Sequence, residues 1–305
     1  MTFKKAIWIS IFCFVGCEVK DKNAYSQQDL ISDLNFLTDP LLDGRKVGTW
    51  GEDIAALYLK TKFEALNYSV KVASFSIQEC RFQLKIPING KNVIAFLDGS
   101  DAKKETIILS AHYDGVGRKE DNLFHPAADD NASGTVALLA LAKMIKKRNW
   151  NKDILLIAFG GEEAGLCGSI AYVRDVSTEN FKVNLNLDMV GRPMIFSAPA
   201  VFLTGDDDRA NEIVQFFKKA SKNSGLEVLV GSDLKEQPWW RWRSDHYSFH
   251  ESGVLGLMLT DGNPGGNEKQ RYFIHTPNDS KDKINFQYLE QVVNLVFKVL
   301  IELDK

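Results

Sequence analysis

Two histidines and five of the carboxylates in five short segments could together form a metal centre. Imidazole and carboxylate groups are the usual ligands of catalytic zinc, and paired metal sites hydrolyse bonds by activating both water and substrate. The segments span residues 111–114, 128–134, 161–166, 186–191 and 274–279, and the side chains concerned are His112, Asp114, Asp130, Glu162, Glu163, Asp188 and His275. Together they predict metal-assisted hydrolysis.

His112 and Asp114 follow a short apolar stretch that predicts a strand. Residues two apart in an extended chain point the same way, so the carboxylate can orient the imidazole for metal binding. Taken alone, the pattern also fits a histidine with a structural role.

Asp129, Asp130 and Asn131 precede a predicted helix, and one of them is expected to cap it. A cap needs a single residue, so two polar side chains are left over. A carboxylate with both oxygens free could bridge two cations roughly 3.5–4 Å apart.

Glu162 and Glu163 follow an entirely apolar strand and two glycines. Adjacent carboxylates repel each other unless cations lie close by. We expect one of them to bind metal and the other to take a proton from water; the alternative is a solvated surface pair. Asp188 ends a second apolar strand, and His275 lies in a proline-containing loop, where an ordered turn is the alternative explanation.

The elements that position these residues predict an α/β fold. Apolar strands that alternate with helices indicate one three-layer domain, with a mixed, mostly parallel central sheet covered by helices on both faces. The chemical residues follow the carboxyl ends of the strands, where such sheets place their sites. Strands are predicted at 69–75, 81–88, 92–97, 106–111, 154–159, 183–187 and 254–259, with a turn at Asn89-Gly90, and helices at 50–66, 133–147, 169–174, 208–221 and 285–303.

An ordered set of motifs makes residues 27–305 resemble the secreted bacterial di-zinc aminopeptidases, the aminopeptidase Y and leucyl aminopeptidase-like zinc exopeptidases. The motifs are His-x-Asp, Asp-Asp-Asn-Ala-Ser-Gly, Gly-Glu-Glu-Ala-Gly-Leu-x-Gly-Ser, Asn-Leu-Asp-Met-Val-Gly-Arg, Arg-Ser-Asp-His and His-Thr-Pro-Asn-Asp, preceded by Leu-Leu-Asp-Gly-Arg and Gly-Thr-Trp-Gly. The resemblance implies the zinc exopeptidase fold, which is phosphorylase/hydrolase-like.

The resemblance also implies a ligand set for two zinc ions. Asp130 would bridge them, His112 and Asp188 would complete one site, and Glu163 and His275 would complete the other. Three carboxylates against two Zn²⁺ leave a residual charge of about +1, which favours hydroxide near neutral pH.

The implied activity is that of a metallo-aminopeptidase, which removes N-terminal residues from peptides that have a free N-terminus. Glu162 would be the general base acting on a water that bridges the metals, and Asp114 would orient the metal-binding histidine. Asp245 and His246 match the family's Ser-Asp-His motif and are expected to line the substrate pocket. Trp240, in a cluster of tryptophans just before them, is expected either in that pocket or in the core.

Two alternatives remain open. Glutaminyl cyclases share this fold and much of the ligand set with a single zinc, but they do not usually show the compact Glu-Glu-Ala-Gly-Leu motif. A non-catalytic binding protein on the same scaffold would have lost ligands, and none is missing here.

Composition limits the partners. The chain has 305 residues, of which 45% are hydrophobic, enough for a full core. A net charge of −3 and a pI near 6.0 give no electrostatic basis for nucleic-acid binding. The sequence does not indicate an oligomeric state.

Two cysteines lie in the predicted domain. Cys80 and Cys167 could pair in an oxidising compartment or remain separate buried thiols. Cys167 follows the glutamate pair, and we interpret it as a small core side chain.

The N-terminal residues predict export. Lys4 and Lys5 precede an apolar run, and Gly16 stands directly before Cys17. Residues 1–17 therefore resemble a bacterial lipoprotein signal, 18–26 a tether, and 27–305 the catalytic domain. The expected location is periplasmic or at the cell surface, with membrane contact only through lipid on Cys17; an ordinary cleaved signal is the alternative.

Replacing Cys17 by serine tests this expectation. Because the thiol would carry the lipid, C17S should block normal processing and move the protein from the membrane fraction to the soluble fraction. Immunoblots of fractionated cells measure both effects, and unchanged processing and fractionation would rule out the lipoprotein hypothesis.

Overall fold

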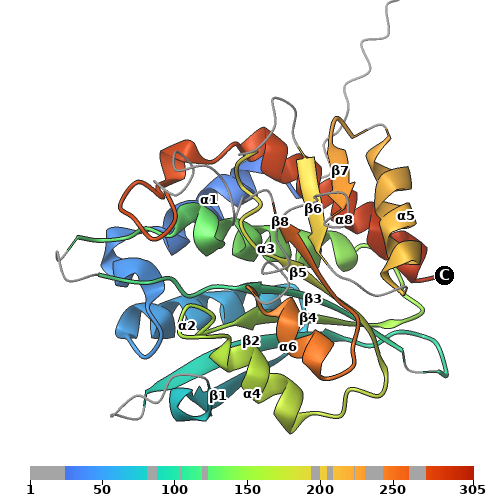
Figure 1. Ribbon diagram of the computed structural model, residues 1–305, viewed down its shortest axis with the longest axis horizontal. Helices are drawn as coiled ribbons and strands as arrows, with labels where there is room; N and C mark the ends of the chain where they lie inside the picture. Colours follow the sequence, from blue (N-terminus) through green and yellow to red (C-terminus); the bar gives the residue numbers. More distant parts are fainter. Residues whose placement is uncertain are drawn as a thin grey trace, which may run out of the picture.

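An eight-stranded sheet runs through the described part of the chain in the order β1-β2-β4-β3-β5-β8-β6-β7 (Figure 1). The computed structural model describes residues 25–80, 88–103, 105–118, 123–193, 200–204, 209–222, 224–230, 243–260 and 273–305. The strands are β1 (Ser69–Ser76), β2 (Asn89–Leu97), β3 (Thr106–His112), β4 (Asp153–Phe159), β5 (Phe181–Leu187), β6 (Ala200–Thr204), β7 (Glu227–Val230) and β8 (Gly256–Thr260).

The centre of the sheet is parallel. Strands β4, β3, β5 and β8 run in the same direction, whereas β2 and β6 lie antiparallel beside them. Every residue of β3, β4 and β8 is buried, which explains why these strands read as continuous apolar runs. The prediction of a mixed, mostly parallel sheet is confirmed.

Helices cover both faces of this sheet (Figure 1). On one face, the largest apolar cluster includes side chains from α1, α2, α3, α5 and α8. On the opposite face, a second cluster packs α4 and α6 against the strands. Neighbouring strand residues alternate between them: Ile107 and Leu109 face the first cluster and Ile108 faces the second. The helices are α1 (Gln27–Leu37), α2 (Trp50–Ala65), α3 (Gly134–Ile145), α4 (Cys167–Asp175), α5 (Ala210–Ser221), α6 (His246–Glu251) and α8 (Phe286–Leu303). None of the helices in the described ranges is long and apolar enough to cross a membrane.

The predicted turn at Asn89-Gly90 is wrong. Both residues belong to β2, where Asn89 pairs with Ser76 and Gly90 pairs with Phe75. A Cβ on Gly90 would meet the Phe75 ring at 2.3 Å, so this glycine makes room for an aromatic side chain. The predicted strand at 81–88 falls almost wholly outside the described residues.

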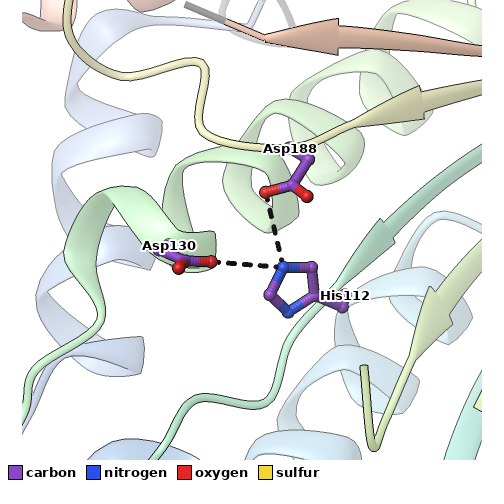
Figure 2. A group of neighbouring side chains, drawn as sticks. All are labelled: His112, Asp130 and Asp188. Atoms are coloured by element: carbon purple, nitrogen blue, oxygen red, sulfur yellow. Dashed lines mark ion pairs between the residues drawn. The ribbon is translucent and has the colours of Figure 1, made fainter. Parts of the chain in front are cut away.

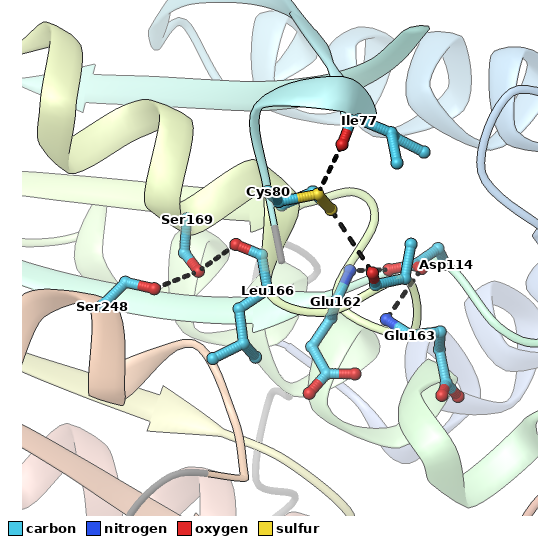
Figure 3. The surroundings of a disulfide bond; sticks show 10 residues. Ile77, Cys80, Asp114, Glu162, Glu163, Leu166, Ser169 and Ser248 are labelled. Atoms are coloured by element: carbon cyan, nitrogen blue, oxygen red, sulfur yellow. Dashed lines mark hydrogen bonds between the residues drawn. A yellow bond between two sulfur atoms is a disulfide. The ribbon is translucent and has the colours of Figure 1, made fainter. Parts of the chain in front are cut away.

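A disulfide bond joins Cys80 to Cys167, across 87 positions of sequence (Figure 3). Cys80 follows the short helical turn after β1, and Cys167 begins α4 directly after the loop that carries Glu162 and Glu163. Of the two possibilities that the sequence left open, the structure has the paired one, and Cys167 is buried in an apolar cluster, as the interpretation of a core side chain expects. The bond ties the glutamate loop to the edge of the sheet.

Removal of this disulfide should destabilise the fold. A cross-link over so long a segment typically contributes about 2–4 kcal/mol, so C80A/C167A should lower the melting temperature by roughly 5–15 °C. Calorimetry of the oxidised protein measures the shift, and wild-type protein treated with reductant should show the same one. Alkylation of Cys80 and Cys167 in the oxidised wild type, without prior reduction, would contradict the assignment.

Candidate metal centre

Two groups of potential metal ligands share one aspartate at the carboxyl edge of the sheet. The first contains His112, Asp130 and Asp188, and the second contains Asp130, Glu163 and His275. His112 Nε2 lies 3.4 Å from both Asp130 Oδ1 and Asp188 Oδ1 (Figure 2). On the other side, His275 Nε2 lies 3.2 Å from Asp130 Oδ2 and 2.9 Å from Glu163 Oε2. The structure thus brings all five predicted ligands together.

The sheet fixes the first group directly. His112 is the last residue of β3, and its carbonyl accepts a hydrogen bond from the Thr135 hydroxyl at 2.8 Å. Asp188 follows β5, and its N–H donates to the Leu259 carbonyl of β8 at 3.0 Å. Both ligands therefore start from parallel strands whose positions are set by the core.

The turn that carries Asp130 is joined to β5 by an amide side chain. Asn131 Nδ2 donates to the Leu187 carbonyl at 2.8 Å, and its Oδ1 accepts the Met189 N–H at 3.1 Å. Gly134 lies so close to this junction that a Cβ would meet the Leu187 carbonyl oxygen at 2.3 Å. The Asp-Asp-Asn-Ala-Ser-Gly motif therefore contains one candidate ligand and several residues that hold it in place.

Asp114 holds the backbone of both neighbouring glutamates, whose side chains then reach different places (Figure 3). Its carboxylate is fully buried and accepts the N–H of Glu162 at 3.1 Å and of Glu163 at 3.3 Å. It also lies 3.6 Å from His112 Nδ1, and its role in orienting that imidazole stays a prediction. Glu163 reaches His275, whereas Glu162 Oε2 stays 4.0 Å from His112 Nε2 and belongs to neither ligand group.

The electrostatics of the site favour bound positive charge. Burial and the charges of nearby carboxylates raise the pKa of Glu163 to about 7 and that of Glu162 well above its usual range. Burial alone would lower the pKa of His275, but hydrogen bonds to Asp130 and Glu163 raise it to about 11. Burial would likewise raise the pKa of Asp130, but the imidazoles of His112 and His275 outweigh it and hold that pKa below its usual range. The carboxylates therefore favour a positively charged partner, which a divalent cation would supply.

The residues fit a divalent metal. His112 Nε2 and Asp188 Oδ1 are buried and have no hydrogen-bond partner among the described residues, although buried polar atoms nearly always have one. Nitrogen and oxygen donors in groups of three, each including an imidazole, suit zinc. Glu163 Oε1 is also buried and has no hydrogen-bond partner among the described residues.

Sequence reasoning gave no role to several residues that support the ligands. Asp129 Oδ1 accepts the Gly191 N–H at 2.8 Å and Oδ2 accepts from Arg192 Nε at 2.9 Å, which ties two motifs together. Arg45 is fully buried and donates to the backbone carbonyls of Leu37, Tyr113, Pro126 and Ala127. In the sequence, Asp129, Arg192 and Arg45 are distinguished only by standing at the ends of the family motifs.

The predicted pocket residues are described in part. Asp245 and His246 are buried at the start of α6. Burial raises the pKa of Asp245 to about 7, and Asp245 in turn lies near enough to raise the pKa of Glu162. Substrate binding by this pair stays a prediction; Trp240 and Cys17 lie outside the described residues.

Comparison with known proteins identifies the family. The model of Peptidase family M28 matches residues 92–300. Aminopeptidase YwaD from Bacillus subtilis strain 168 is 32% identical over 234 residues, which cover 75% of this chain and 48% of that protein. A probable zinc metalloprotease from Leptosphaeria maculans is 34% identical over 265 residues, which cover 74% and 60%. The chain belongs to peptidase family M28, and it spans about half the length of the Bacillus relative.

Solved structures show the same fold. A zinc aminopeptidase from Bacillus subtilis superposes with a TM-score of 0.75 at 21% identity, over 93% of this chain and 97% of that one. A glutaminyl cyclase from Bacteroides thetaiotaomicron gives a TM-score of 0.70 at 20% identity, over 90% and 97%. Because both activities occur on this scaffold, the likeness supports the fold and does not choose between them.

Proposed function

We propose that this chain is a zinc-dependent aminopeptidase with two zinc ions bridged by Asp130. The observation that carries the proposal is the pair of ligand groups on either side of this one carboxylate. Each Asp130 oxygen faces a different imidazole, and each imidazole has its own second carboxylate, Asp188 or Glu163. A site for a single ion would not need both groups.

Peptide hydrolysis follows from this arrangement. Zinc bound here would polarise the scissile carbonyl and lower the pKa of the attacking water. Glu162 is close to the ligands without belonging to either group, so its carboxylate can take the proton of that water and return it to the leaving amine. Asp114 lies beside the His112 ring and accepts the Glu162 N–H, so it fixes the position of the general base relative to that ligand.

Removal of N-terminal residues is supported by the named relatives, among them an aminopeptidase and several probable leucine aminopeptidases. Export as a lipoprotein through Cys17 forms part of the proposal, and the Cys80–Cys167 disulfide suits an oxidising compartment. The substrates are therefore peptides with a free N-terminus outside the cytoplasm.

A substrate panel tests the activity. Amino-acid amides, N-blocked peptides and peptides beginning with glutamine should be incubated with zinc-loaded protein, with and without chelator. We expect hydrolysis only at free N-termini, loss on chelation, and two zinc ions per chain by metal analysis. Cyclisation of N-terminal glutamine with a single zinc would favour a cyclase, and no turnover of any substrate would favour a binding protein.

Substitution of Glu162 by glutamine separates proton transfer from metal binding. Glutamine keeps the shape but cannot accept a proton, so E162Q should lower kcat by roughly 10²–10⁴-fold while both zinc ions remain. D130A should instead lose metal, because both groups share that carboxylate. Metal content and kcat are measured on the same samples; an active E162Q enzyme, or one inactive only because it lacks metal, would refute the assignment.

A further inference from the structure

His275 differs from the other candidate ligands in how it is held. His112 and Asp188 follow buried strands, but His275 lies in a turn, and 40% of its side-chain surface is exposed. Its backbone φ is +56°, a left-handed conformation that residues with a side chain rarely adopt. Such a conformation persists only where surrounding contacts enforce it.

Asp279, four residues further on, attaches this turn to the turn that carries the bridging carboxylate. It accepts three consecutive backbone N–H groups: that of Ala128 at its carbonyl oxygen (3.1 Å), that of Asp129 at Oδ1 (2.9 Å) and that of Asp130 at Oδ2 (3.0 Å). Only 1% of Asp279 is exposed, so water does not compete for these bonds. The position of His275 relative to Asp130 is thereby fixed through the main chain.

Arg192 makes a second attachment from the loop after β5. Its Nε donates to Asp129 Oδ2 at 2.9 Å, and a terminal nitrogen lies 3.7 Å from Asp279 Oδ1. The guanidinium also lies 4.7 Å from the centre of the Phe273 ring, two residues before His275. Arg192 therefore contacts the His275 turn on both sides of the histidine.

We propose that Asp279, Arg192 and Phe273 form a clamp that positions His275 and so controls the affinity of one metal site out of two. The inference rests on the proposed two-zinc function. His275 belongs to only one group, whereas His112 and Asp188 of the other group follow β3 and β5. The shared Asp130 is held a second time, independently of the clamp, because Asn131 bonds to Leu187 and Met189. Loosening the clamp should therefore weaken one metal and spare the other.

Cobalt(II) titration of the metal-depleted full chain tests the clamp without relying on activity. Wild-type protein should bind two equivalents, followed by calorimetry and visible absorption. R192M and D279N should bind the first equivalent as the wild type does and the second at least tenfold more weakly. F273L keeps an apolar side chain and leaves no buried charge unpaired, so it should show the same selective loss even if R192M does not fold.

Ligand variants identify which site is affected. The one-cobalt form of each clamp variant should have the absorption spectrum of H275A and differ from that of H112A. Y68F is the matched control, because it removes a buried hydrogen bond, from the Tyr68 hydroxyl to the Ala142 carbonyl at 2.9 Å, that lies outside the ligand loops. It should lower the melting temperature and leave both cobalt affinities unchanged.

Three results would refute the clamp proposal. They are equal weakening of the affinity for both cobalt equivalents, unchanged affinities in every clamp variant that folds, and a one-cobalt spectrum that matches H112A. A wild-type protein that binds fewer than two equivalents would instead refute the proposed function. The two failures are therefore distinguishable in one series of titrations.

Discussion

Buried negative charge is the constraint on which the rest of this structure depends. The edge of the sheet gathers the carboxylates of Asp130, Glu162, Glu163 and Asp188 in a region with little solvent. Ionised groups are costly to bury unless positive charge lies beside them. Divalent cations bound here would offset this cost, and the hydrogen bonds of the surrounding turns hold the carboxylates in place for them.

A parallel sheet suits this task because it supplies fixed starting points. The carboxyl ends of β3, β4 and β5 lie side by side, so residues distant in sequence meet without long, ordered connections. Proteins of this fold differ in the side chains that follow the strand ends and in the reactions that those side chains carry out. That is why a glutaminyl cyclase and a zinc aminopeptidase resemble this chain almost equally in backbone and why side-chain roles decide function.

The ligands were predictable from sequence, whereas their supports were not. His112, Glu163 and Asp188 follow apolar strands, and a polar residue in such a place indicates chemistry. Asp279 and Arg45 act mainly on backbone atoms of remote segments, and no periodicity or spacing records such contacts. Local rules also misled at Asn89-Gly90, because a turn-forming pair was overridden by strand pairing and by the space needed for an aromatic ring.

The scatter of the ligands along the chain has a consequence for how the protein is made. The candidate ligands extend from position 112 to position 275, and neither of the two groups found among the described residues lies within one short stretch. An unfolded polypeptide therefore offers no ready chelating motif, unlike a zinc finger whose ligands lie a few residues apart. On the proposed function, a newly synthesised chain would acquire metal only after β3, β5 and the His275 turn have come together, so metal loading would take place in the compartment where folding finishes.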